Sequence, residues 1–221
     1  LVLTIVFTAL TLPPYALSQD NPYVSVPRAI RNMCHPERFP DLYLLTKPHC
    51  AYVDADDYEG MQRGEKPKTV GHHGSPWADD RDIPLFFYGK GIRKGQLAGT
   101  ANLVDLAPTV AFLMGGQKPS ASTGRVLHEI LEPETAHWGT KDRPKVVVLF
   151  SLDQCRRDHF GVFAQALPFL RKRIIAQGAF FTNTHLTYAM TATAVSHTTM
   201  GIRHEPQSLR RGQSGPRLSP R

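Results

Sequence analysis

The stretch "KVVVLFSLD" (145–153), followed by "FAQALPFLRKRIIAQGAFFTNTHL" (163–186), decides the fold. Its first part is a continuous apolar run that ends in a carboxylate, as is typical of an inner parallel strand covered on both faces. A helix that ends at Gly178 is predicted from the spacing of its inward-facing apolar residues, Leu167, Leu170, Ile174 and Ile175, although Pro168 weakens or kinks its first turn. "AFFTNTHL" (179–186) predicts the next strand. This β-α-β unit predicts an α/β fold with a mostly parallel sheet flanked by helices.

The residues before this unit show a similar pattern. "DLYLLTKP" (41–48) and "DIPLFFYG" (82–89) predict short buried strands, and "NLVDLAPTVAFLMGG" (102–116) predicts a helix that ends at its two glycines. The acidic "VDADDYEG" (53–60) lacks the remaining ligand positions of an EF-hand, so we expect a solvated loop rather than a calcium site. The polar stretch 131–145 separates the two patterned regions.

Composition narrows the class of protein. The chain has 221 residues, 41% hydrophobic and 20% charged, which is ordinary for a globular protein of one large domain or two small ones. The net charge of +7 is concentrated at the end, because residues 201–221 hold five arginines and one glutamate but no aromatic residue. This composition predicts a disordered basic tail, and nucleic-acid binding is not expected. Three widely spaced cysteines indicate neither a disulfide framework nor a thiolate zinc site.

The beginning of the chain allows two interpretations. "LVLTIVFTALTLPPYALSQ" (1–19) resembles the apolar region of a signal peptide, but it lacks an initiator Met and a basic flank. The alternative is a core segment of a chain whose start is missing. Its apolar run is too short to span a bilayer, so no membrane association is predicted.

Two carboxyl-terminal strand ends indicate where a ligand would bind. In open α/β sheets ligands bind beyond the carboxyl ends of the strands, where Asp153 lies. "YAMTATAVSHTTMG" (188–201) follows the next strand and could open a helix, whose first N–H groups and dipole favour phosphate near Thr193. On the residues alone, Thr193 could equally be a helix cap and Asp153 a turn cap. His72 and His73, in "VGHHGSPWADDRDIPLFFYGKG" (70–91), could lie in a polar surface turn.

Several segments together resemble the alkaline phosphatase superfamily. "GAFFTNTHL" resembles its "GA.FTNAHY", "TATAVSH" its "T.TAPGH", and "HHGSPWADDRDIPLFFYGKGI" its "THGSPY.YDT.VPLLFYG.GI". "HPERFPDLYLLTKP" and "VDLAPT" match two further motifs, so that the resemblance covers most of residues 30 to 200. The branch it resembles most is the type I phosphodiesterase/nucleotide pyrophosphatase and Thr-nucleophile phosphatase group. The C/S-x-P-x-R context of sulfatases does not occur.

The resemblance implies hydrolysis of phosphoesters or nucleotide phosphodiesters with two Zn²⁺ ions. It makes Thr193 the nucleophile and a metal ligand, Asp153 a carboxylate ligand of the same ion, and His73 a ligand of the other ion. His197 and Asp80 match positions that we interpret as structural, and we interpret His72 as a surface residue. A periplasmic or secreted parent is the expectation, and the sequence predicts no oligomeric state.

The order of the segments departs from that of the family. Residues 1–135 resemble the carboxyl-terminal part, 136–144 form a join, 145–200 resemble the amino-terminal part, and the family's middle region has no match. Each zinc needs at least three protein ligands, which three matched residues cannot supply for two ions. The sequence therefore predicts an inactive fragment or fusion of such a hydrolase, with an incomplete fold. The alternative is a non-catalytic, metal-free fusion product.

Overall fold

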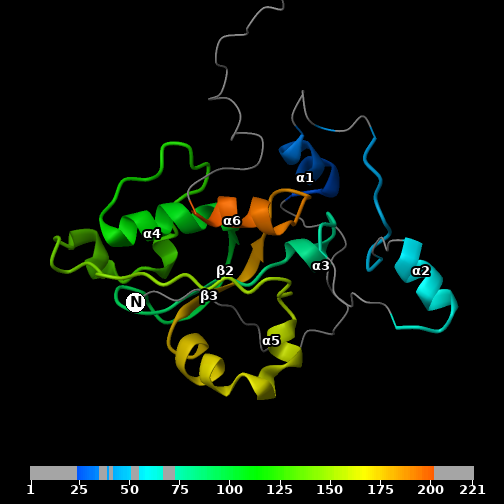
Figure 1. The fold of residues 1–221 in the computed structure, drawn as a ribbon. Coiled ribbons are helices and arrows are strands. Elements are labelled where there is room, and N and C mark those ends of the chain that lie inside the picture. Colours follow the sequence, from blue (N-terminus) through cyan, green and yellow to red (C-terminus); the bar gives the residue numbers. More distant parts are fainter. Residues whose placement is uncertain (1–23, 35–38, 40–41, 51–54, 67–72, 202–221) are drawn as a thin grey trace, which may run out of the picture.

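The computed structural model describes residues 24–34, 39, 42–50, 55–66 and 73–201. It contains short helices around a small sheet (Figure 1). In chain order the elements are α1 (Val26–Met33), α2 (Ala55–Gln62), α3 (Ala78–Arg81), β1 (Phe86–Phe87), β2 (Gly95–Asn102), the 3₁₀ helix η1 (Leu103–Asp105), α4 (Leu106–Met114), the 3₁₀ helices η2 (His128–Ile130) and η3 (Pro133–His137), α5 (His159–Val162), the 3₁₀ helix η4 (Ala164–Ala166), the π-helix η5 (Leu170–Ile175), β3 (Ala179–His185) and α6 (Thr193–Gly201).

The sheet has the order β1-β3-β2, so the last strand in sequence lies in the middle. β3 runs parallel to β2 and antiparallel to β1. The α/β class is confirmed, but the prediction of a mostly parallel sheet is wrong, because the three strands form a mixed sheet. Since β1 and β2 precede the predicted join and β3 follows it, one sheet unites both regions; the boundaries given above remain predictions.

Residues 146–152 form no strand, so the strand predicted there is wrong. Two neighbours already occupy β3: β2 along most of its length, and β1 opposite Ala179 and Phe180. A bridge between Asp82 and His185 covers the far end of the β1 side. The apolar segment thus finds no free edge beside β3, and it remains extended with Val146 57% and Phe150 51% exposed.

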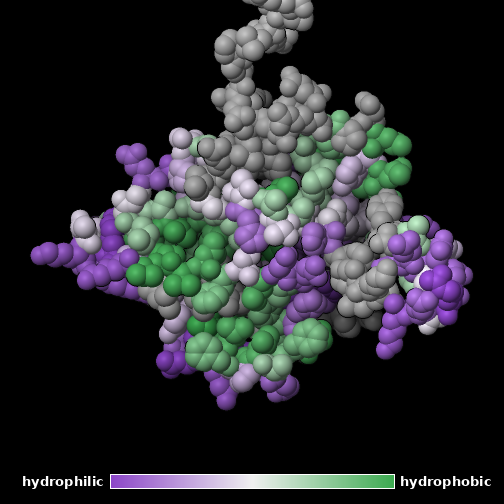
Figure 2. All heavy atoms as spheres, viewed as in Figure 1, coloured by the Kyte–Doolittle hydropathy of each residue, from purple (hydrophilic) through white to green (hydrophobic). Residues whose placement is uncertain are grey.

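The remaining predictions have mixed outcomes. The strand at 179–185, the helix that ends at Gly115 and the helix within 188–201 are confirmed. The strand predicted at 82–89 is reduced to the two residues of β1, and the helix predicted after residue 163 is split around Pro168 into η4 and η5. Residues 42–47 form no strand, and the described part of the acidic stretch is helical in α2 rather than a loop. Figure 2 shows α2 as a mainly hydrophilic projection.

The core joins residues from both sides of the predicted join. The Phe86 ring makes edge-to-face contacts with Phe160 and Phe180, at centroid distances of 6.1 and 5.8 Å. Gly178 allows β3 to begin close to β1, since a Cβ there would lie 2.3 Å from the Phe87 carbonyl oxygen. Met200 of α6 also packs against this core, which attaches α6 to the sheet.

Three sequence predictions fall outside the described residues: the apolar start (1–19), the basic tail beyond residue 201, and the surface position of His72. Among the helices that the structure describes, none combines the length and apolar character needed to cross a bilayer.

Candidate functional site

Two of the sequence-predicted site residues meet directly. Thr193 is the first residue of α6, and its hydroxyl donates a hydrogen bond to Oδ2 of Asp153 at 3.3 Å. The other carboxylate oxygen of Asp153 accepts a hydrogen bond from the backbone N–H of Gln154 at 2.9 Å. Gln154 adopts a left-handed φ of 56°, which turns the chain sharply after the carboxylate. Asp153 and Thr193 are both exposed, so an incoming ligand can reach the pair.

The turn after His73 is anchored to the segment that leads into α6. The Gly74 N–H donates to the Thr191 hydroxyl at 2.6 Å, and the Ser75 N–H donates to Oδ2 of Asp80 at 2.7 Å. The Thr191 hydroxyl donates in turn to Asp80 at 3.5 Å. Thr191 is only 8% exposed, so these bonds lie largely away from water. These bonds attach the turn after His73 to Thr191, which precedes Thr193 by two residues in the sequence. Asp80 supports the turn by accepting two of them.

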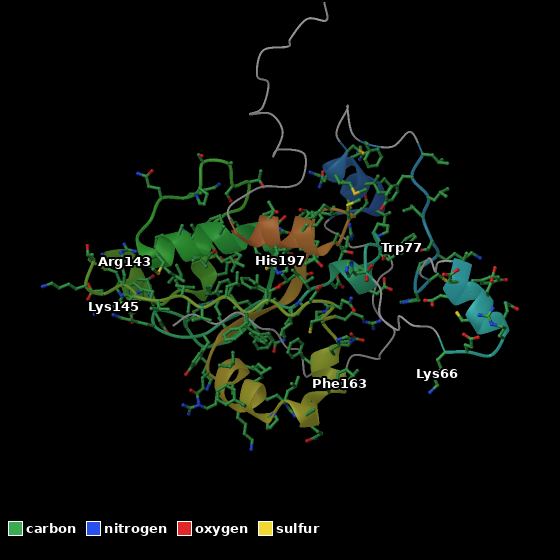
Figure 3. All side chains as sticks on the ribbon, viewed as in Figure 1. Lys66, Trp77, Arg143, Lys145, Phe163 and His197 are labelled. Carbon is green, nitrogen blue, oxygen red and sulfur yellow. The ribbon has the colours of Figure 1, made fainter. Side chains whose placement is uncertain are left out.

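A cavity of about 810 Å³ unites these residues, because His73, Asp153 and Thr193 all line it. His197, one turn further along α6, also lines it; the helix position of this histidine is visible in Figure 3. Its Nδ1 lies 2.9 Å from the Thr193 carbonyl oxygen, and since a carbonyl can only accept, Nδ1 carries the hydrogen. His197 thereby reinforces the start of α6.

The described lining of the cavity is acidic. Four carboxylates line it, those of Asp79, Asp80, Asp82 and Asp153, against the single guanidinium of Arg156. Burial raises the pKa of Asp82, although the charges of Arg157 and Arg81 oppose this shift. An anionic phosphate would meet net negative charge here, so its binding requires a cation.

A histidine-carboxylate pair that the sequence did not predict lies on the same cavity. Nδ1 of His49 lies 3.2 Å from Oδ2 of Asp79, and both residues line the cavity. The pair is held by the Trp77 indole, which donates to the Thr46 carbonyl at 2.9 Å. A histidine directly after the "LLTKP" run is a weak signal, and only the folded chain shows that it lines the same cavity as Thr193.

The two-zinc site implied by the family resemblance does not fit the described residues. Among them, no group of three or more His, Cys, Asp or Glu side chains is placed to share a metal ion. Asp153 and Thr193 form a contact pair, and His73 reaches the same cavity from another segment.

Part of this chain is similar to alkaline phosphatases. It is 32% identical over 80 residues to alkaline phosphatase PhoK of a Sphingomonas species, covering 36% of this chain and 13% of PhoK. It is 30% identical to PhoV of Synechococcus elongatus, covering 49% of this chain and 18% of PhoV. It is also 30% identical to PafA of Elizabethkingia meningoseptica, covering 53% of this chain and 20% of PafA.

The matched region therefore spans a fifth or less of the length of each of these relatives. No family model matches the chain. No solved structure matches it either.

Proposed function

We propose that this chain carries the nucleophile side of a phosphoester hydrolase site of alkaline phosphatase type, with Thr193 as the residue that meets phosphorus. The observation that supports this most is the hydrogen bond from Thr193 to Asp153 at the start of α6, in a cavity that also includes His73. The similarity to PhoK, PhoV and PafA supports the same class of chemistry.

The residues around Thr193 suit contact with phosphate. The first N–H groups of a helix lack intrahelical acceptors and carry the positive end of the helix dipole, and α6 presents them beside the Thr193 hydroxyl. Asp153 accepts the hydroxyl hydrogen and so orients the oxygen lone pairs. An exposed carboxylate orients a threonine hydroxyl but is too weak a base to deprotonate it.

We nevertheless expect the chain to be catalytically silent by itself. A bound divalent ion supplies the lowered hydroxyl pKa in metal-dependent phosphoester hydrolysis. The described residues do not complete a site for such an ion. Purified chain should therefore hydrolyse p-nitrophenyl phosphate no faster than Thr193→Ala, with or without excess zinc. Zinc-dependent turnover that is lost in both Thr193→Ala and His73→Ala would contradict the expected silence.

A binding measurement tests the site apart from turnover. Because the cavity lining is acidic and the described residues complete no zinc site, inorganic phosphate should bind weakly, added zinc should strengthen this binding only modestly, and Asp153→Asn should remove the gain. Asp56→Asn is the matched control, since Asp56 is an exposed carboxylate on α2 that does not line the cavity. Phosphate binding that does not depend on zinc would argue against the proposed site. So would equal weakening of phosphate binding by Asp153→Asn and Asp56→Asn. Binding of neither zinc nor phosphate would favour the alternative of a non-catalytic, metal-free product.

Two finer elements belong to this proposal. The resemblance of the segments around His73 and Thr193 to nucleotide pyrophosphatases favours phosphodiesters, so bis(p-nitrophenyl) phosphate should compete with inorganic phosphate for binding. The same resemblance favours a periplasmic or secreted parent protein, which cell fractionation of the source organism would test.

A further inference from the structure

The cavity is much larger than a phosphate group needs, and its additional wall is apolar. Its volume of about 810 Å³ lies in the range of pockets that hold whole organic ligands. Two segments without regular structure supply this wall: Leu44 and Leu45 from one, and Leu149, Phe150 and Leu152 from the other.

The wall adjoins the proposed phosphate end through the sequence itself. Leu152 precedes Asp153 directly, and Phe150 lies three residues before it. The wall side chains retain substantial contact with solvent, with Phe150 51% and Leu149 44% exposed. Covering such apolar surface contributes roughly 25 cal/mol per Å², so an apolar group placed there gains affinity.

We propose that this wall binds the organic group of the ester, and that the group is aromatic or otherwise apolar. The inference rests on the proposed function for the phosphate end of the cavity, while the wall itself can be probed without a phosphate. Phe150 offers an aromatic face, and aromatic pairs add stabilisation beyond the area that they bury. A sugar or another polyhydroxylated group would leave its hydroxyls against leucine side chains without hydrogen-bond partners.

The test compares 1-naphthol, 1-naphthyl phosphate and inorganic phosphate, with binding followed by probe fluorescence or calorimetry on the full chain with added zinc. We expect 1-naphthol to bind, and Phe150→Ala to weaken both naphthyl compounds about tenfold while leaving inorganic phosphate unchanged. Phe169→Ala is the matched control, because Phe169 is 65% exposed but does not line the cavity. Far-ultraviolet circular dichroism checks that both variants keep the fold.

The outcomes separate the two proposals. Tighter binding of 1-naphthyl phosphate than of 1-naphthol, lost in Phe150→Ala alone, supports both. Binding of 1-naphthol at the Phe150 wall with no gain from the phosphate supports the apolar wall and contradicts the phosphate site. Binding of inorganic phosphate with no gain from the naphthyl group overturns the inference and leaves the proposed function standing. Equal losses in Phe150→Ala and Phe169→Ala would mean general association with exposed apolar surface, and would also overturn it. The Phe169→Ala control is needed because the chain exposes other hydrophobic surface, such as that between α4 and α5 in Figure 2.

Discussion

Replacing Thr191 with Val removes the hydroxyl that ties the His73 turn to the approach to α6, while it preserves the shape of the side chain. The hydroxyl accepts the 2.6 Å hydrogen bond from Gly74 and donates the 3.5 Å bond to Asp80. A net hydrogen bond contributes about 1 kcal/mol, and a donor left without a partner away from water adds about 1–3 kcal/mol. Because Gly74 is only half-buried and water can reach it in part, we expect a total loss of about 2 kcal/mol.

Urea denaturation followed by fluorescence would measure this loss, and thermal unfolding would show it as a fall of about 2–4 °C in Tm for each kcal/mol. Thr198→Val is the control: Thr198 is exposed on α6 and its hydroxyl bonds only within the helix, to the Ala194 carbonyl, so its change should stay within about 0.5 kcal/mol. Equal effects of the two substitutions would refute the reasoning that Thr191 joins the two regions.

Two further predictions concern backbone packing and pH. Gly124→Ala should lower the free energy of unfolding by more than about 2 kcal/mol, because a Cβ at Gly124 would lie 2.0 Å from the Val104 carbonyl oxygen. Gly99→Ala is the control: nothing lies within 4 Å of a Cβ there, so the urea midpoint should not change, and equal losses in the two variants would contradict the prediction. Burial lowers the pKa of His185 to about 4, and the charges of Arg81 and Arg157 act in the same direction. Because the unfolded chain then binds the proton more tightly than the folded chain, the free energy of unfolding should fall by up to about 3 kcal/mol as the pH drops from 6.5 to 4. Urea titrations at successive pH values would measure this dependence, and His185→Gln should remove the part that His185 contributes. An unchanged slope in the variant would contradict this.

Local sequence patterns predicted the helices and strands whose own residues favour that structure. The helix ending at Gly115 was predictable because a left-handed glycine, with φ of 78°, ends it, and β3 was predictable from its run of aromatic and β-branched residues. Thr193, Asp153 and His73 were identified through motifs, and the structure brings them to one cavity.

Pairing partners could not be predicted in the same way. The sequence does not predict β2, because "GQLAGTAN" has few apolar residues and only Leu97 and Ala101 among them are buried. This segment forms a strand because it pairs with β3. The segment 146–152 was predicted as a strand because it has every local property of one, but no neighbouring strand is available to it. The pairing of His49 with Asp79 also depends on tertiary contacts alone.

The central place of β3 has a consequence for synthesis of the chain. β1 and β2 emerge from the ribosome long before β3, yet they touch each other in the sheet only through β3. Until residues 179–185 are made, the aromatic side chains of β1 lack the strand that covers them. The nascent chain must therefore hold an unfinished core from the synthesis of β2 until the synthesis of β3. The contacts that complete the sheet join residues far apart in sequence, which slows folding. Chaperone occupancy of the nascent chain should accordingly persist until β3 has left the exit tunnel.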